Sequence, residues 1–142
     1  MPLRRHLIAL ALLSSTALGA HAQAVLKVAT DATFPPMEFF ENNQRTGFDT
    51  ELVEAIGKQL GRKIEWVDID FKGLIPALVS RRVDMAVSAI YITDERRKVV
   101  DFTVPYYAGG LVVMTRADNG AIKSPADLAG RKVTVQVGTK SV

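Results

Sequence analysis

The stretch "GFDTELVEAIGKQLGRKIEWVDI" (residues 47–69) decides the fold, because a helical pattern runs directly into a strand pattern. Asp49 is expected to be the N-cap of the helix, and Gly61 is typical of a helix end. Apolar residues recur at helical spacing between them: Leu52, Val53, Ile56 and Leu60. The second part, "KIEWVDI" (63–69), predicts a strand. We therefore expect a helix that packs beside a strand of one sheet.

The segments on either side continue the alternation. "VLKVAT" (25–30) predicts a first strand, and "GLIPALVSRR" (73–82) a short helix. The residues of this helix that are expected to face inward are Leu74, Ile75, Leu78 and Val79. "VDMAVSA" (83–89) is apolar enough for a strand buried on both faces, as parallel strands between helices are. The order strand-helix-strand-helix-strand predicts an α/β layer domain.

The C-terminal third predicts more elements of the same kind. Gly109-Gly110 is expected to be a pivot before a strand over residues 111–115. Ser124 is a predicted N-cap, with Pro125 at the first helical position and Gly130 as the stop. "KVTVQV" (132–137) predicts a further strand. Since no helix follows to cover that strand, we expect the sequence to be incomplete.

The first 24 residues, "MPLRRHLIALALLSSTALGAHAQA", predict a secretory signal peptide. A basic start, an apolar run over residues 7–13 and a small-x-small cleavage site occur in that order. We expect the signal peptide to cover residues 1–22, although cleavage after residue 24 fits equally well. The sequence contains no Cys, which excludes a lipid-anchored form and a disulfide framework.

Composition excludes several classes of function. Without Arg4 and Arg5, 16 basic side chains face 15 acidic ones, and no basic stripe indicates a nucleic-acid partner. Both His residues lie within the predicted signal, and no Ser stands in a nucleophile elbow. The carboxylates do not have metal-ligand spacing. We therefore predict no catalytic residue, metal or cofactor.

A cluster of charge follows an apolar strand in "SAIYITDERRKVVDFTVPYY" (88–107). One explanation is a helix start, with Thr93 as the N-cap, acids in the first turn and bases further along. The other is that one of these charges points back into a cleft and holds a ligand. The residues alone leave both explanations open.

Several ordered motifs resemble the family 3 extracellular solute-binding proteins, the periplasmic receptors of polar amino-acid ABC transporters. "GFDTELVEAIGKQL" is similar to the family signature. The other matching stretches are "DATFPPMEF", "IDFKGLIPAL", "AIYITDERRKVVDFT" and "DLAGRKVTVQVGT". The resemblance implies a periplasmic-binding-protein fold of two α/β lobes that enclose the ligand. Residues 23–108 would form most of lobe one, and residues 109–142 would begin lobe two, whose remainder is missing.

The resemblance also implies a binding site. Arg96 falls where the family grips the ligand's α-carboxylate, which suits a planar guanidinium of permanent charge. A solvated helix charge, the alternative, fits Arg97 and Lys98 better. Phe34 and Phe71 fall where relatives sandwich the ligand side chain, although both could be ordinary core aromatics. Asp31 either contacts a polar or cationic ligand side chain or forms a turn through its own backbone.

Further site residues depart from the family pattern. The backbone of Ser88 and Ala89 is expected to complete the first-lobe site, but Tyr91 stands where many relatives carry Ser or Thr. A phenol there either narrows the pocket or swings out of it. In lobe two, Gln136, Thr139 and Lys140 are expected near the carboxylate at a helix N-terminus, where free N–H groups bind anions. Lys140 replaces a residue that is often Gly or Thr.

The function implied is a binding protein, not an enzyme. It would be a periplasmic monomer, related to glutamine- and histidine/lysine-arginine-ornithine-binding proteins, that delivers an amino acid to an ABC permease. Asp31 and the aromatic pair favour glutamine, arginine, lysine or histidine over an acidic ligand. A periplasmic dehydratase of prephenate or arogenate type is the alternative, because it shares this fold. A ligand-sensing domain of a larger signalling protein is a third possibility.

Overall fold

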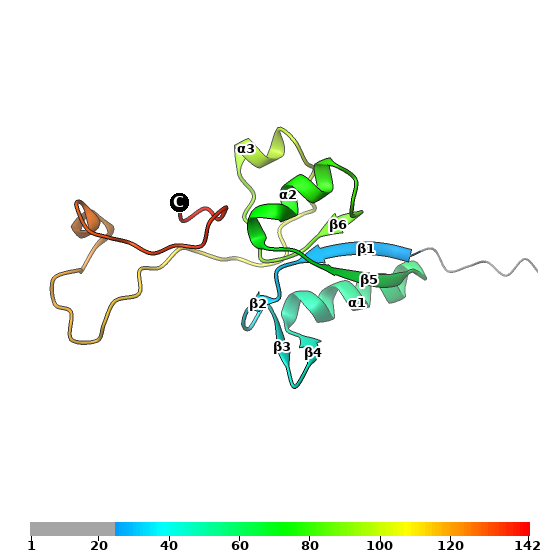
Figure 1. The fold of residues 1–142 in the computed structure, drawn as a ribbon, viewed down its shortest axis with the longest axis horizontal. Coiled ribbons are helices and arrows are strands. Elements are labelled where there is room, and N and C mark those ends of the chain that lie inside the picture. The colour runs from blue at the N-terminus through cyan, green and yellow to red at the C-terminus, as the bar shows by residue number, and fades with distance from the viewer. Residues whose placement is uncertain (1–24) are drawn as a thin grey trace, which may run out of the picture.

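The computed structural model describes residues 25–142, so the predicted signal peptide lies outside the described residues. Its centre is a parallel sheet of three strands in the order β5-β1-β6 (Figure 1). These strands are β1 (Val25–Thr30), β5 (Lys63–Asp68) and β6 (Met85–Ala86). Val25 pairs with Lys63 at the start of β1, and Val28 pairs with Met85 near its middle. The predicted α/β class is confirmed, but the third strand is shorter than residues 83–89.

Two helices cover opposite faces of this sheet (Figure 1). Helix α1 (Phe48–Leu60) packs Val53 with the β1 residues Leu26 and Val28. Helix α2 (Phe71–Val79) packs Leu74 and Ala77 with Ala29 and Val83. Because successive side chains of a strand point to opposite faces, neighbouring residues of β1 contribute to different clusters. The core therefore has two layers, one on each face of the parallel sheet. Helix α1 packs on one face and helix α2 on the other.

The expected start of α1 is wrong. The helix begins at Phe48, and the N-cap position is held by Gly47 at φ 113°, so Asp49 lies inside the first turn and is fully buried. Gly61 ends the helix in the left-handed conformation, as predicted.

The expected apolar face of α1 is only partly correct. Ile56 is 37% exposed and Leu60 is 60% exposed. The helix instead approaches β5 through Gly57, where an added Cβ would lie 2.7 Å from Ile64 Cδ1. At 3.6 residues per turn, Leu60 lies on the same helix face as Val53, but it is the last residue of α1 and stays exposed.

Helix α2 also differs from its prediction. It begins at Phe71, two residues before the expected start, and Val79 is 56% exposed. At 3.6 residues per turn, Val79 is rotated well away from the face that carries Leu74 and Ala77. Ala77, which the apolar pattern had not selected, is buried in its place.

A second, antiparallel sheet was not predicted. It consists of β2 (Thr33–Phe34), β3 (Glu38–Glu41) and β4 (Gln44–Thr46), which are too short to show a clear alternation. Asn42 and Asn43 both have positive φ, as a tight hairpin turn between β3 and β4 requires. We call β2, β3 and β4 together the meander.

One arginine connects the meander to the parallel sheet. The guanidinium carbon of Arg45 lies 4.7 Å from the centroid of the Phe40 ring and 5.0 Å from that of Trp66. Its Nη2 atom lies 2.8 and 2.7 Å from the two carboxylate oxygens of Asp68 at the end of β5. We call these four residues the Arg45 clasp.

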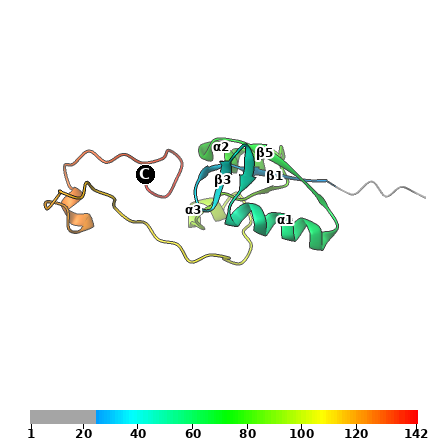
Figure 2. The same ribbon diagram turned by 90° about the horizontal axis from the view of Figure 1, so that it is seen from below.

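Residues 109–142 contain no strand, so the predicted strands over 111–115 and 132–137 are wrong. A strand needs a partner for its backbone groups, and none lies beside these residues within the described part of the chain. A 3₁₀ helix, η1 (Pro125–Leu128), begins after Ser124, which is its N-cap as predicted. Residues 109–142 as a whole run away from the sheet, and their C-terminal end comes back toward it (Figure 2). No helix in residues 25–142 is long and apolar enough to span a membrane.

Candidate functional site

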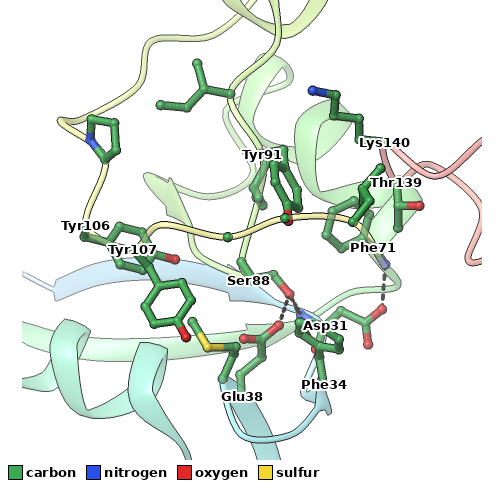
Figure 3. Close-up of a pocket in the computed structure, with 18 of the residues that line it drawn as sticks. Asp31, Phe34, Glu38, Phe71, Ser88, Tyr91, Tyr106, Tyr107, Thr139 and Lys140 are labelled. Atoms are coloured by element: carbon green, nitrogen blue, oxygen red, sulfur yellow. Dashed lines mark hydrogen bonds between the residues drawn. The ribbon is translucent and has the colours of Figure 1, made fainter. Parts of the chain in front are cut away.

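A cavity of about 680 Å³ opens at the carboxyl ends of β1 and β6, the edge where α/β domains bind ligands. Its walls come from the meander, the start of α2, the loop after β6, the 103–112 segment and the C-terminal loop (Figure 3). Nine of the ten residues expected from the sequence line it: Asp31, Phe34, Phe71, Ser88, Ala89, Tyr91, Gln136, Thr139 and Lys140. Arg96 does not line it.

Arg96 lies behind one wall of this cavity, on helix α3 (Asp94–Arg97). Thr93 is the N-cap as predicted, since its hydroxyl accepts from the Arg96 N–H at 3.2 Å. The guanidinium turns back toward the cavity wall, 5.7 Å from the centroid of the Phe71 ring. The first explanation of the charge cluster is confirmed, because a helix begins there. That Arg96 holds a ligand stays a prediction.

Two main-chain carbonyls accept from the Arg96 guanidinium. Nη1 donates to the Tyr91 oxygen at 2.6 Å and Nη2 to the Gly138 oxygen at 2.9 Å. Burial lowers the pKa of Arg96, as expected for a cation partly removed from water. By contrast, the neighbouring Arg97 is exposed. Arg96 therefore joins the loop after β6 to the C-terminal loop.

Asp31, at the end of β1, forms the turn that the sequence offered as one alternative. Its Oδ1 accepts from the Thr33 hydroxyl at 2.8 Å. Its Oδ2 accepts from the Phe71 N–H at 2.9 Å and from Gln136 Nε2 at 3.0 Å. One carboxylate thus ties together β1, the start of α2 and the C-terminal loop.

Glu38, at the start of β3, lines the cavity although the sequence analysis did not select it. It is 1% exposed, and the Ser88 hydroxyl donates to its Oε1 at 2.6 Å. Burial, helped by the nearby carboxylates of Asp49 and Asp31, raises the pKa of Glu38 to about 8, against the opposing effect of the Ser88 hydrogen bond. An acid between Met37 and Phe39 was the available signal, because a lone carboxyl in an apolar run is costly to bury.

Asp49, which the sequence predicted as the N-cap of α1, is a second acid with an unpredicted role at the cavity. Its Oδ2 accepts from the Ala89 N–H at 2.8 Å and from the Tyr106 hydroxyl at 3.0 Å. Burial, followed by the charge of Asp49, raises the pKa of Tyr106, so the phenol stays protonated and donates. Ala89 has φ 45°, a conformation that is uncommon for a residue with a Cβ.

Tyr91 extends across the cavity toward the 103–112 segment (Figure 3). A Cβ added at Gly109 would lie 3.0 Å from its hydroxyl, and the Lys140 ammonium lies 5.9 Å from the centroid of its ring. Thr139 donates to the Gln136 carbonyl at 2.8 Å and so closes a local turn. Within residues 25–142, no group of three or more His, Cys, Asp or Glu side chains could hold a metal ion.

Known proteins resemble this chain in sequence and in structure. Residues 26–140 match the family model of the bacterial extracellular solute-binding proteins, family 3. A probable histidine-binding protein of Campylobacter jejuni is 44% identical over 120 residues, which are 84% of this chain and 47% of that protein. The ABC transporter arginine-binding protein 1 of Escherichia coli is 38% identical over 136 residues, covering 95% of this chain and 55% of that protein.

The structural similarity agrees with the sequence similarity. An ancestral arginine-binding protein, solved bound to arginine, has a TM-score of 0.81 and 46% identity, covering 85% of this chain and 54% of that one. This chain spans about half the length of the proteins it matches. All three are named as amino-acid-binding proteins rather than enzymes, which favours binding over the dehydratase alternative. The chain belongs to the bacterial extracellular solute-binding proteins, family 3.

Proposed function

We propose that the chain binds a free polar or basic amino acid in the cavity and serves as the solute-binding component of an ABC transporter. The observation that carries the proposal is the cavity itself, which is walled by Phe34, Phe71 and Tyr91 and has the Arg96 guanidinium against the Phe71 ring. Its volume of about 680 Å³ falls within the range of small-molecule pockets.

Arg96 is the proposed carboxylate anchor. Its guanidinium already has acceptors in the Tyr91 and Gly138 carbonyls, so its donors are oriented before the ligand arrives. A ligand carboxylate that replaces the Gly138 carbonyl would exchange a neutral acceptor for a charged one. Charge-assisted hydrogen bonds are roughly twice as strong as neutral ones, which favours the exchange.

The aromatic side chains are proposed to select the ligand side chain. Phe34 is 54% exposed, so its ring is available to a ligand rather than committed to the core. A guanidinium, imidazole or amide can stack on such rings, and a cation gains further from the ring electrons. The names of the similar proteins, which specify histidine and arginine, point the same way.

Membership of the family supports a proposal about where the protein acts. We propose a periplasmic monomer that is exported by the signal peptide predicted over residues 1–22 and delivers its ligand to a permease in the inner membrane. Lobe one over residues 23–108 and the start of lobe two over residues 109–142 remain the proposed division of the chain.

Ligand binding to the full chain tests the function. Thermal-shift measurements with the twenty amino acids should show a higher melting temperature with arginine, histidine, lysine or glutamine, because a ligand that binds only the folded state stabilises it. If no amino acid changes the melting temperature and titration calorimetry detects no heat, the proposed function is wrong.

The role of Arg96 is tested by Arg96→Lys. An ammonium cannot reproduce the two-pronged fork, so the affinity for every bound amino acid should fall about 10- to 100-fold, the range for loss of a charge-assisted bond. Arg97→Lys is the matched control, since Arg97 is the next residue of α3 but is exposed. Equal affinities of the two variants would refute the assignment.

A further inference from the structure

We propose that Glu38 and Asp49 are positioning residues, which together hold the Ser88–Ala89 segment in its binding conformation, and that the proton on Glu38 controls the affinity for the ligand. This inference rests on the proposed amino-acid-binding function. It assigns roles to two side chains that are expected to act on the ligand through other groups.

Two consecutive residues of the cavity wall are each held by a carboxyl group from a different element. Ser88 donates its hydroxyl to Glu38 of β3 at 2.6 Å. Ala89 donates its N–H to Asp49 of α1 at 2.8 Å. The same Ser88 oxygen accepts from the Asp31 N–H at 3.2 Å, so the wall is also connected to β1. Figure 3 shows the two bonds of Ser88, to Glu38 and to Asp31.

The backbone at this point needs such support. Ala89 has φ 45°, and left-handed conformations cost a residue with a Cβ roughly 1–2 kcal/mol relative to the usual regions. Residues in sparsely populated conformations persist only where their surroundings fix them. The Asp49 carboxylate, which is fully buried and also accepts from the Tyr106 hydroxyl at 3.0 Å, is the partner that fixes Ala89.

The two acids are close enough to interact, since Asp49 opposes the ionisation of Glu38. Glu38 Oε2 and Asp49 Oδ1 are buried and lack a hydrogen-bond partner. Two ionised carboxylates would leave like charges together in the protein interior, whereas a proton on Glu38 supplies a donor for its neighbour. The raised pKa of Glu38, about 8, is consistent with a proton held there at neutral pH.

The groups around Glu38 determine whether its ionisation raises or lowers the affinity for the ligand. Asp49 from α1 and Asp31 from the end of β1 oppose its ionisation, and the Ser88 hydroxyl after β6 favours it. Tyr106 contacts Asp49 and stays protonated. When pH rises past the pKa of Glu38, its new charge is therefore placed beside Asp49 and Asp31. The Ser88–Ala89 segment, which bonds to both Glu38 and Asp49, would shift, and ligand affinity would fall.

Titration calorimetry of the full chain with L-arginine, L-histidine and L-glutamine at pH 6.5 and pH 9 tests the proposal. Affinity should fall at least about 10-fold between the two pH values in the wild type. Glu38→Gln should largely remove this pH dependence, because the amide cannot ionise. Glu38→Ala should bind more weakly than Glu38→Gln at pH 6.5, because only the amide keeps an acceptor for Ser88. Glu41→Gln, an exposed position of the same strand, is the matched control and should keep the wild-type profile.

The possible results separate the role of Glu38 from the proposed binding function. The ligand's own amino group titrates identically in all proteins, so the difference between Glu38→Gln and Glu41→Gln isolates Glu38. Equal pH dependence in those two variants, or none in the wild type, overturns the inference alone. Binding of none of the three amino acids at either pH, together with no thermal shift from any of the twenty, overturns the proposed function and the inference with it. If Glu38→Gln does not fold, Ser88→Ala replaces it: loss of the hydroxyl should move the fall in affinity to higher pH, and an unmoved profile refutes the role.

Discussion

Gly47→Ala should be among the most destabilising single-methyl additions in this chain. Gly47 has φ 113° and ψ 168°, a region populated essentially by glycine, which costs other residues about 1–3 kcal/mol. An added Cβ would also lie 2.7 Å from the Met37 carbonyl carbon, a backbone atom that cannot swing aside. To make room for the methyl group, residues 36–37 would have to move away from the start of α1. That movement would strain the bonds from Asp49 N–H to Met37 O at 2.8 Å and from Phe48 N–H to Pro36 O at 3.1 Å. At about 1 kcal/mol for each bond, the free energy of unfolding should fall by about 3–5 kcal/mol.

Urea denaturation followed by fluorescence measures this effect, because Trp66 is the only tryptophan of the chain and lies in β5. Gly61→Ala is the matched control. Gly61 has φ 63°, and nothing lies within 4 Å of an added Cβ, so this variant should lose only about 1 kcal/mol from the backbone conformation. If Gly47→Ala loses no more than Gly61→Ala, the contact with Met37 does not constrain the fold, and the reasoning is wrong.

Two further predictions concern stability and the C-terminal loop. The pKa of Glu38 is raised from 4.5 to about 8 on folding, so its contribution to stability is complete below pH 4.5 and is lost as pH rises through 8. The loss is at most about 1.4 kcal/mol per pH unit in that window, and urea midpoints of Glu38→Gln should lack it. Gly138→Ala would place a Cβ 2.9 Å from Lys72 Cα at φ 84°, which should displace the Gly138 carbonyl from Arg96. Because the ligand carboxylate would no longer have to replace that carbonyl, titration calorimetry should show stronger amino-acid binding. Gly120→Ala, where the space is open, should bind as the wild type does.

The sequence predicted the elements whose signals are local. The strand over residues 25–30 was correct at both ends, and Thr93, Gly61 and Ser124 cap their helices as expected. A cap depends on one side chain or one backbone angle, so it can be recognised without knowledge of the rest of the fold.

Features that depend on distant partners were missed. Gly57 lets α1 approach Ile64 on β5 closely, and no pattern within the helix reveals that contact. The strand pattern of residues 132–137 is strong, but strands form only where a neighbouring strand pairs with them. Local alternation therefore overestimates strands wherever that pairing is absent from the structure.

The candidate site also contains residues that the sequence predicted and residues that it did not. The lining residues were found because the resemblance supplied their positions, whereas Glu38 and the inward-facing role of Asp49 were not found. Asp49 looked like a helix cap because Asp near a helix start usually is one. Its carboxylate instead crosses to Ala89, a residue 40 positions later in the chain. Burial of an acid is a property of the assembled layers, so the sequence offered only an indirect signal for Glu38, its place between Met37 and Phe39.

The Arg45 clasp has an evolutionary consequence. Arg45 lies between two rings and holds Asp68, so its replacement by Lys would lose both the flat stacking surface and the guanidinium geometry. Substitution at any one of the four positions therefore changes the selection on the other three. Among homologues, residues 40, 45, 66 and 68 should covary as a group, even though they belong to three different strands. A lineage that has lost the arginine should also have replaced the carboxylate at position 68, because that acid would no longer have its cation.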